Sequence, residues 1–133
     1  MAKGYEKCQE RVNALSRFGK DLVRRSGSKC ELCEATGVKL AVYEVEPVEQ
    51  EPHFDDCIFI CETCREQLSR PKNVRPNHWR CLNNTLWSDV PAVQVIALRV
   101  LKRLTGQGEA WAEELLEMAY PSEEISNWAA MAE

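Results

Sequence analysis

Apolar side chains recur every three or four residues near the start of the chain, which is the spacing of one helix face. The pattern covers residues 5–25 and predicts an amphipathic helix there. Its apolar stripe consists of Cys8, Val12, Leu15, Phe18 and Leu22. We expect the basic side chains to face solvent, namely those of Arg11, Arg17, Lys20 and Arg24. The Ser-Gly-Ser sequence at 26–28 ends the helix directly before a pair of cysteines.

Two short apolar runs in the middle of the chain predict a β-hairpin. Residues 40–45 form the first run, which Pro47 ends, and residues 57–60 form the second run, which leads into another pair of cysteines. Good helix formers follow at 62–68. We therefore expect a helix that begins at the second cysteine pair and has ended by Pro71.

The second half of the chain predicts helices. One has Ser88 or Asp89 as its cap and Pro91 in its first turn, and it ends before Gly106. Its middle, residues 93–101, is apolar on nearly every side, so we expect this helix to be the main core element.

Two shorter helices are predicted after it. Residues 109–119 place Trp111, Leu115 and Met118 on one side, and Ser122 begins a last helical segment that runs through Trp128.

The length and composition fit one soluble globular domain. A chain of 133 residues buries about two-thirds of the surface that it exposes when unfolded. Apolar residues make up 44% and charged residues 29%, which excludes collagen-like and mucin-like chains. We predict one domain, 1–133, made of an N-terminal helix (1–27), a metal-binding part (28–70) and a helical part (71–133). The predicted fold class is α+β, mostly α.

Charge is distributed in alternating blocks, although the net charge is only −4. Residues 1–30 carry eight basic and three acidic side chains, and residues 31–64 carry one and nine. Residues 65–105 carry eight basic and two acidic side chains, and residues 106–133 carry seven acidic side chains and no basic one. The blocks either form a basic face for nucleic acid opposite an acidic face, or pair with one another inside the domain.

Neither a membrane span nor a secretory signal is visible in the sequence. No window is apolar over the length that spans a bilayer, and the first residues lack a hydrophobic stretch. We therefore expect a cytoplasmic protein without a membrane partner. In that reducing compartment, seven cysteines indicate metal ligands rather than disulfides.

Two CxxC pairs carry the strongest chemical signal. Cys30 and Cys33 form one pair, Cys61 and Cys64 form the other, and 27 residues separate them. Zinc takes four thiolates from such spacings, and the hairpin and helix around them predict a treble-clef or zinc-ribbon arrangement. Four cysteines leave no open coordination position, so the predicted site holds one structural Zn²⁺ and is not catalytic. Iron, a redox role for one pair, and free core thiols stay open as alternatives.

Three further cysteines remain. Cys8 lies on the first apolar stripe and Cys57 begins an apolar strand, so both are interpreted as small core residues. Cys81 stands in a polar, aromatic segment, and nothing near it in sequence lowers the pKa of its thiol.

A nuclease centre of the HNH type is the enzymatic alternative for a treble clef. Such a centre needs a histidine at the end of the first strand as general base, but this strand ends in Glu44 and Glu46. Glu44, Glu46 and His78 are the available substitutes. We predict no catalytic residues.

A binding surface is the next candidate site, at Arg75, His78, Trp79 and Arg80. Trp79 and Trp87 near these basic side chains suit stacking on single-stranded nucleic acid. Helical spacing with Leu82 and Leu86 favours a core position for both tryptophans instead. Another candidate surface, for self-association, is formed by Trp111, Ile125 and Trp128.

Five segments together resemble the zinc-ribbon-like N-terminal region of the PhnA family, whose members have been labelled alkylphosphonate utilisation proteins. The segments are 27–33 (GSKCELC), 42–47 (VYEVEP), 61–64 (CETC), 77–83 (NHWRCLN) and 87–95 (WSDVPAVQV). They occur in order, and the likeness runs from about Leu22 to the end of the chain.

The resemblance implies a zinc-binding cytoplasmic protein whose family name does not define a reaction. Members commonly continue into a small β-rich domain, which we do not expect in this chain, so the resemblance covers the zinc module alone. We expect a non-catalytic module that binds a protein or nucleic-acid partner. The alternative is a diverged metal-dependent nuclease or a phosphonate-related hydrolase.

Overall fold

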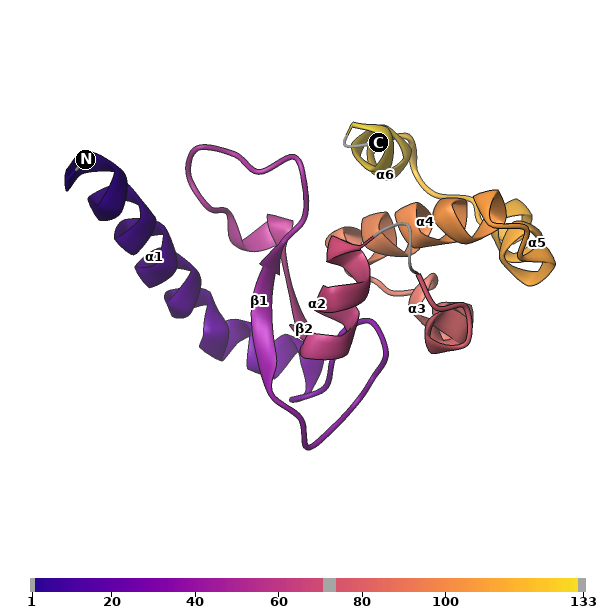
Figure 1. Cartoon of the computed structure of the whole chain (residues 1–133), viewed down its shortest axis with the longest axis horizontal. Helices are drawn as coiled ribbons and strands as arrows, with labels where there is room; N and C mark the ends of the chain where they lie inside the picture. Colours follow the sequence, from indigo (N-terminus) through magenta and orange to yellow (C-terminus); the bar gives the residue numbers. More distant parts are fainter. Residues whose placement is uncertain (1, 71–73, 132–133) are drawn as a thin grey trace.

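The computed structural model describes residues 2–70 and 74–131, with side chains from residue 10 onward. Within them the chain is mostly helical and has one two-stranded antiparallel sheet (Figure 1). The strands are β1 (Leu40–Glu44) and β2 (Cys57–Cys61). The helices are α1 (Ala2–Ser26), α2 (Glu62–Ser69), α3 (Leu82–Thr85), α4 (Pro91–Gly106), α5 (Ala110–Met118) and α6 (Glu123–Ala130), with short 3-10 turns η1 (Phe54–Asp56) and η3 (His78–Cys81). The predicted α+β, mostly α, fold class is confirmed.

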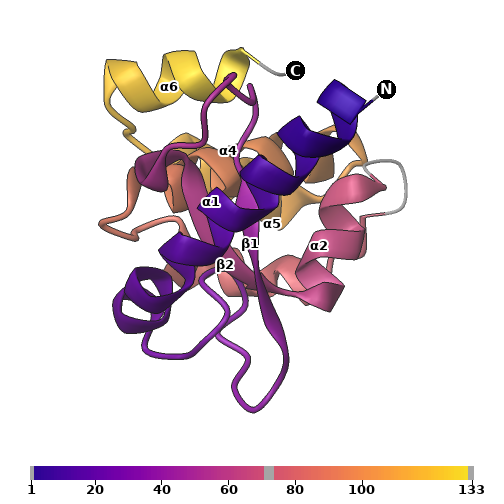
Figure 2. The same cartoon turned by 90° about the vertical axis from the view of Figure 1, so that its left-hand side faces the viewer.

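The hairpin lies at the centre of the molecule. Leu40 pairs with Cys61 and Glu44 with Cys57, so the second cysteine pair stands beside the start of β1. Helix α1 packs along one side of the hairpin, and α2 and α4 lie on the other side (Figure 1). The turned view shows α1 crossing in front of the two strands (Figure 2).

Helix α1 buries most of the apolar stripe that the sequence predicts, with Val12 as the exception among the described side chains. Leu22 is fully buried and the Phe18 ring meets the edge of Phe54, but Val12 is 55% exposed. Arg11, expected to face solvent, turns inward instead. Its guanidinium binds the carboxylate of Glu44 at the end of β1, which fixes the rotation of the helix.

Helix α4 is the main core element, as predicted. Its buried residues lie all round the helix, from Ala92 to Leu104. The predicted cap is wrong, because the capping position is Val90 and neither Ser88 nor Asp89 occupies it. The Ser88 hydroxyl accepts a hydrogen bond from the Val90 backbone at 3.1 Å, and so shapes the turn before the helix instead.

One buried residue of α4 is charged. Arg99 is 4% exposed, and its guanidinium donates to the carbonyl oxygens of Trp128 and Ala129 near the end of α6. It also donates to the carbonyl of Glu46, just after β1. The Trp128 and Ala129 carbonyls lie at the negative end of the α6 dipole, so they suit a cation. Arg99 thus joins the last helix to the hairpin.

The C-terminal helices partly follow the sequence prediction. Ser122 caps α6 by accepting from the Ile125 backbone at 3.2 Å, as expected. Met118, however, is 59% exposed, so its predicted place on the buried side of α5 is wrong.

The three apolar residues considered for self-association lie against the core. Trp111, Ile125 and Trp128 are partly buried there. Trp128 also donates through its indole nitrogen to the Glu46 carbonyl at 3.1 Å. Among the described helices, none combines the length and the apolar character needed to cross a bilayer.

Candidate metal centre

The structure brings the four predicted cysteine ligands together. Cys30 and Cys33 stand on the turn after α1, Cys61 is the last residue of β2, and Cys64 lies in the first turn of α2. The four Sγ atoms all lie within 4.8 Å of one another. Cys30 and Cys64 are 3.7 Å apart at sulfur, and Cys33 and Cys61 are 3.6 Å apart. This group of four thiols, the tetrad below, can hold a metal ion.

The sulfur spacing matches a tetrahedron of the size that zinc needs. Zinc–sulfur bonds of about 2.3 Å in tetrahedral geometry place neighbouring sulfurs about 3.8 Å apart. The two pairs that the structure measures, at 3.7 and 3.6 Å, fall close to that edge length. The backbone therefore presents the thiols in position for a closed four-sulfur shell.

A tight turn shapes the first cysteine pair. Glu34 adopts a left-handed conformation with φ of 64°, and its backbone nitrogen donates to the Cys30 carbonyl at 2.9 Å. The turn aims the Cys33 backbone N–H at Cys30 Sγ, 3.4 Å away. A second N–H, from Cys61, reaches the same sulfur at 3.3 Å. The Sγ atom of Cys30 therefore accepts a backbone hydrogen bond from each of the two cysteine pairs.

These contacts concentrate negative charge on Cys30. The hydrogen bond from Cys64 is the main cause that lowers the pKa of Cys30 to about 4, and the backbone N–H groups add to it. Burial raises the pKa of Cys33 to about 12. The pKa of Cys64 is also raised, first because it donates to Cys30 and then because it is buried. Without a metal, the tetrad thus keeps protons on Cys33 and Cys64 at neutral pH.

Glu31, between the two cysteines of the first pair, ties the turn to its neighbours. Its carboxylate accepts from Arg25 of α1 through two hydrogen bonds, at 2.9 and 2.7 Å. It also accepts from the Phe59 backbone of β2 at 2.8 Å. This role of Glu31 could not be predicted from the sequence, because Phe59, one of its partners, lies 28 positions away along the chain.

Thr85 of α3 supports the same turn from the other side. This residue is 5% exposed, and its hydroxyl donates to the Leu32 carbonyl at 2.5 Å. The turn is therefore held by a helix 53 positions later in the chain. The only sign of this role in the sequence is a hydroxyl-bearing residue between Leu82 and Leu86, which have helical spacing.

His78 lies beside the tetrad. Its Nε2 is 3.2 Å from Cys64 Sγ. Burial lowers the pKa of His78, and the charge of Arg75 adds to this, so the imidazole is neutral at pH 7. An open pocket of about 630 Å³ adjoins the tetrad here, with Cys33, Cys61, His78 and Cys81 in its walls.

Of the other predicted binding residues, Arg75 lies near enough to His78 for its charge to lower the pKa of that histidine, whereas Trp79 and Arg80 make contacts elsewhere. Trp79 is fully buried and donates through its indole nitrogen to Gln67 at 3.3 Å, so it offers no face for stacking on a base. Arg80 covers the ring of Trp111 at 4.5 Å instead. The core interpretation is confirmed for Trp79 and wrong for Trp87, which is 53% exposed.

The residues considered for a nuclease centre do not converge. Glu44 ends β1 at the edge of the hairpin away from Cys61, four residues along the strand from Leu40, which corresponds to about 13 Å. Its carboxylate is occupied by Arg11. Glu46 is exposed beyond this end, whereas His78 stands at the tetrad. No joint acid–base site forms among these three side chains.

Outside the tetrad, Cys57 and Cys81 are weak nucleophiles. Cys57 is fully buried, which confirms the core interpretation, and burial raises the pKa of its thiol to about 11. Burial also raises the pKa of Cys81 to about 12. The side chain of Cys8 lies outside the part of the chain whose side chains are described.

Two ion pairs connect the first two charge blocks to each other. Arg11 pairs with Glu44 and Arg25 with Glu31, and both contacts join the basic block 1–30 to the acidic block 31–64. These four charges are therefore satisfied within the domain and are not available to a nucleic acid.

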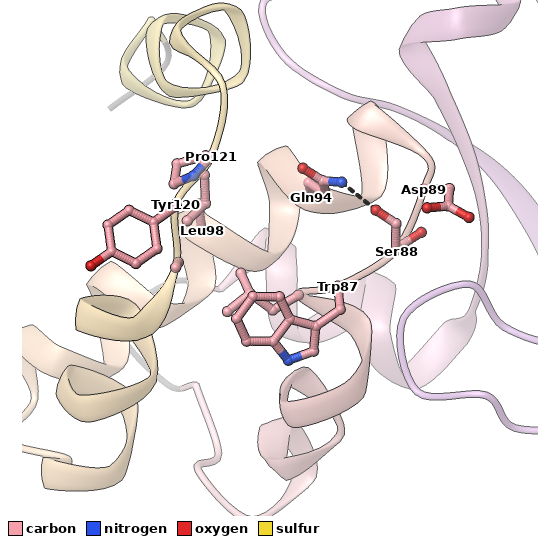
Figure 3. Close-up of a pocket in the computed structure, with 9 residues that line it drawn as sticks. Trp87, Ser88, Asp89, Gln94, Leu98, Tyr120 and Pro121 are labelled. Carbon is pink, nitrogen blue, oxygen red and sulfur yellow. Dashed lines mark hydrogen bonds between the residues drawn. The ribbon is translucent and has the colours of Figure 1, made fainter.

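An aromatic cleft lies away from the tetrad, between the turn before α4 and the linker from α5 to α6. Tyr120 and Pro121 stand on one side of it, Ser88 and Asp89 on the other, and Trp87 lies below (Figure 3). Tyr120 is 92% exposed. The lining residues include one acidic side chain and no basic one.

No family model, no curated protein and no solved structure matches the chain.

Proposed function

We propose that Cys30, Cys33, Cys61 and Cys64 bind one Zn²⁺ ion that stabilises the fold and takes no part in catalysis. The observation that carries this proposal is the sulfur spacing of 3.6 and 3.7 Å, which suits tetrahedral zinc. Four thiolates complete the coordination shell and leave no place for a reactive water. The ion would hold the turn after α1, the hairpin and α2 together, so its binding free energy would add to folding free energy.

Metal analysis of the purified full chain tests the zinc proposal. We expect one zinc per chain and a marked fall in melting temperature when Cys30 and Cys64 are both replaced by serine. Replacement of the non-tetrad Cys81 by serine is the matched control and should leave zinc content unchanged. Iron in place of zinc, or a serine variant with an unchanged melting temperature, would contradict the proposal.

For the chain as a whole, we propose a non-catalytic module that binds a macromolecular partner. The separation of Glu44 from His78 argues against a nuclease centre, and the closed sulfur shell argues against zinc-dependent hydrolysis. Cleavage of DNA in the presence of Mg²⁺ or Mn²⁺, lost on Glu44→Gln or His78→Ala, would instead establish the enzymatic alternative.

A protein is the better-supported partner, and nucleic acid is the alternative. Trp79 is buried, and the aromatic cleft at Trp87 and Tyr120 has no basic lining residue to meet a phosphate backbone. We expect no DNA or RNA binding whose affinity falls steeply with added salt. Strongly salt-dependent binding that weakens on Arg75→Ala or Arg80→Ala would establish nucleic acid as the partner.

The PhnA-like motifs remain the basis for a family proposal, and we place the protein in the cytoplasm. All six cysteines whose side chains are described are free thiols, which suits a reducing compartment. Phosphonate metabolism is linked to the chain through the family label alone.

A further inference from the structure

The aromatic cleft has one wall that hydrogen bonds hold in place. This wall is the turn before α4 (Figure 3). The Gln94 side chain donates to the Ser88 carbonyl, and the Ser88 hydroxyl accepts from the Val90 backbone at 3.1 Å. Leu98, a buried residue of α4, also lines the cleft. The hollow is therefore built on the core of the molecule and not on a loose loop.

Two aromatic side chains of the cleft stay open to solvent. Trp87 is 53% exposed and Tyr120 is 92% exposed. Tyr120 lies between α5 and α6, outside both helices, because Pro121 disfavours the helical conformation for the residue before it. Tryptophan and tyrosine at the edge of a hollow are typical anchors of protein interfaces. The cleft thus offers aromatic rings to a ligand that arrives from solvent.

The acidic side chains around the cleft indicate the charge of that ligand. Asp89 lines the cleft, and Glu123 and Glu124 are exposed in the first turn of α6, just after Pro121. Within residues 10–70 and 74–131, these three carboxylates form no ion pair. Aromatic ring faces attract cations, and a negative surface selects a positive partner. The cleft is therefore complementary to a basic group.

The volume of the cleft limits what can enter it. It measures about 180 Å³, whereas pockets for whole small-molecule ligands usually measure about 300–1,000 Å³. One long side chain suits this space better than a complete small molecule does. Arginine is the basic side chain that stacks best on aromatic rings, because its guanidinium is planar and weakly hydrated.

We propose that the aromatic cleft is a docking site for a basic segment of a partner protein, which places one arginine side chain against Trp87 and Tyr120 with Asp89 at the rim. The inference rests on the proposed function of a protein-binding module and names the chemistry of its partner. It does not involve the tetrad, because none of the residues that line the cleft is a cysteine.

A peptide titration of the zinc-loaded full chain, followed by NMR, tests the site. The probe is the capped pentapeptide Gly-Gly-Arg-Gly-Gly, and its control carries norleucine in place of arginine. We expect saturable shifts at the Trp87 indole N–H and at the backbone amides of Leu98 and Tyr120 with the arginine peptide. Binding of the norleucine peptide should be several-fold weaker, because it keeps the apolar stem and lacks the charge.

Variants of the cleft separate the contributions of ring and charge. Trp87→Leu keeps an apolar side chain but removes the aromatic ring, so the arginine peptide should bind about threefold to tenfold more weakly. Asp89→Asn should also weaken it several-fold. Glu66→Gln removes one charge from an exposed position of α2 and is the matched control, which should bind as the unmodified chain does.

Three results would overturn the proposal: no saturable binding of the arginine peptide, equal affinity for the two peptides, or unchanged affinity in Trp87→Leu. If Trp87→Leu does not fold, the exposed Tyr120 decides the matter through Tyr120→Leu, which should weaken binding and refutes the site if it does not. Shifts at the same residues when the chain alone is concentrated would assign the cleft to a second copy, and so would also overturn the proposal.

Failure of the cleft is distinguishable from failure of the proposed function. Zinc content and salt-dependent binding of DNA and RNA are measured on the same samples. Nucleic-acid binding that weakens on Arg75→Ala would refute the protein partner itself, whereas a silent cleft without such binding refutes the docking site alone.

Discussion

Nε2 of His78 lies 3.2 Å from Sγ of Cys64, close enough for the imidazole to donate a hydrogen bond to a metal-bound thiolate. Histidines and amides that donate to ligand sulfurs hold the ligand in place and spread its charge. The contact gives His78 a positioning role at the proposed zinc site, distinct from that of a ligand.

Replacement of His78 tests this role. We expect His78→Ala to keep one zinc per chain but to lose it to a chelator about tenfold faster, the lower end of the effects seen for such supporting groups. His53→Ala is the matched control, since His53 is exposed on the loop before β2. Equal rates of zinc loss in the two variants would show that the His78 contact does not support the metal site.

Glu31 gives a prediction about stability. Glu31→Ala leaves the Phe59 N–H without its acceptor and Arg25 without its carboxylate, so we expect a loss of about 2–3 kcal/mol in the free energy of unfolding. Urea denaturation with saturating zinc measures it. Glu66→Ala, at an exposed position of α2, should change the free energy by less than about 0.5 kcal/mol. A similar small effect for Glu31→Ala would contradict the assigned role.

The pH dependence of metal binding follows from the tetrad. The pKa of Cys33 is about 12 and that of Cys64 is raised, so both thiols carry protons at neutral pH and must release them to bind zinc. Affinity should therefore rise with pH, by at least about a hundredfold per unit for the two protons that Cys33 and Cys64 release. Competition with a chromophoric chelator between pH 6 and 8 measures the slope. A flat profile would mean that the thiols are already ionised before the metal arrives.

Arg99 gives a prediction about the last helix. Arg99→Met keeps the length of the side chain but removes the donors to Trp128 and Ala129, so α6 should loosen from the core. We expect a loss of about 2–3 kcal/mol in stability, because three carbonyls lose a charged donor. Hydrogen exchange should show faster exchange in residues 123–130 than in α4. Unchanged protection of α6 would contradict the anchoring role.

The grouping of the four cysteines could be predicted from sequence because the spacing that brings them together is local. Each CxxC pair fixes two sulfurs within one turn, and the hairpin between the pairs brings Cys61 beside the start of β1. Residue types and spacing therefore carry the prediction, without knowledge of the packing. Helix α4 could be predicted for a similar reason, since a segment that is apolar on all sides must be buried.

The inward-facing arginines could not be predicted in this way. Arg11 and Arg99 look like ordinary solvated cations, and the groups that bind them lie 29 to 53 positions away along the chain. Burial of a guanidinium is favourable only when such acceptors are in place, so the tertiary fold decides it. Trp87 was wrongly predicted for a different reason. Its helical spacing with Leu82 suggested a core position, but α3 ends at Thr85, before Trp87.

The sulfur of Cys30 accepts backbone hydrogen bonds from both Cys33 and Cys61, one from each pair. The four ligands are consequently unequal partners. With a metal ion bound, each of the four would contribute one bond to the ion, and Cys30 would in addition connect two distant stretches of backbone. Its replacement would separate those stretches even if another donor took its place on the metal.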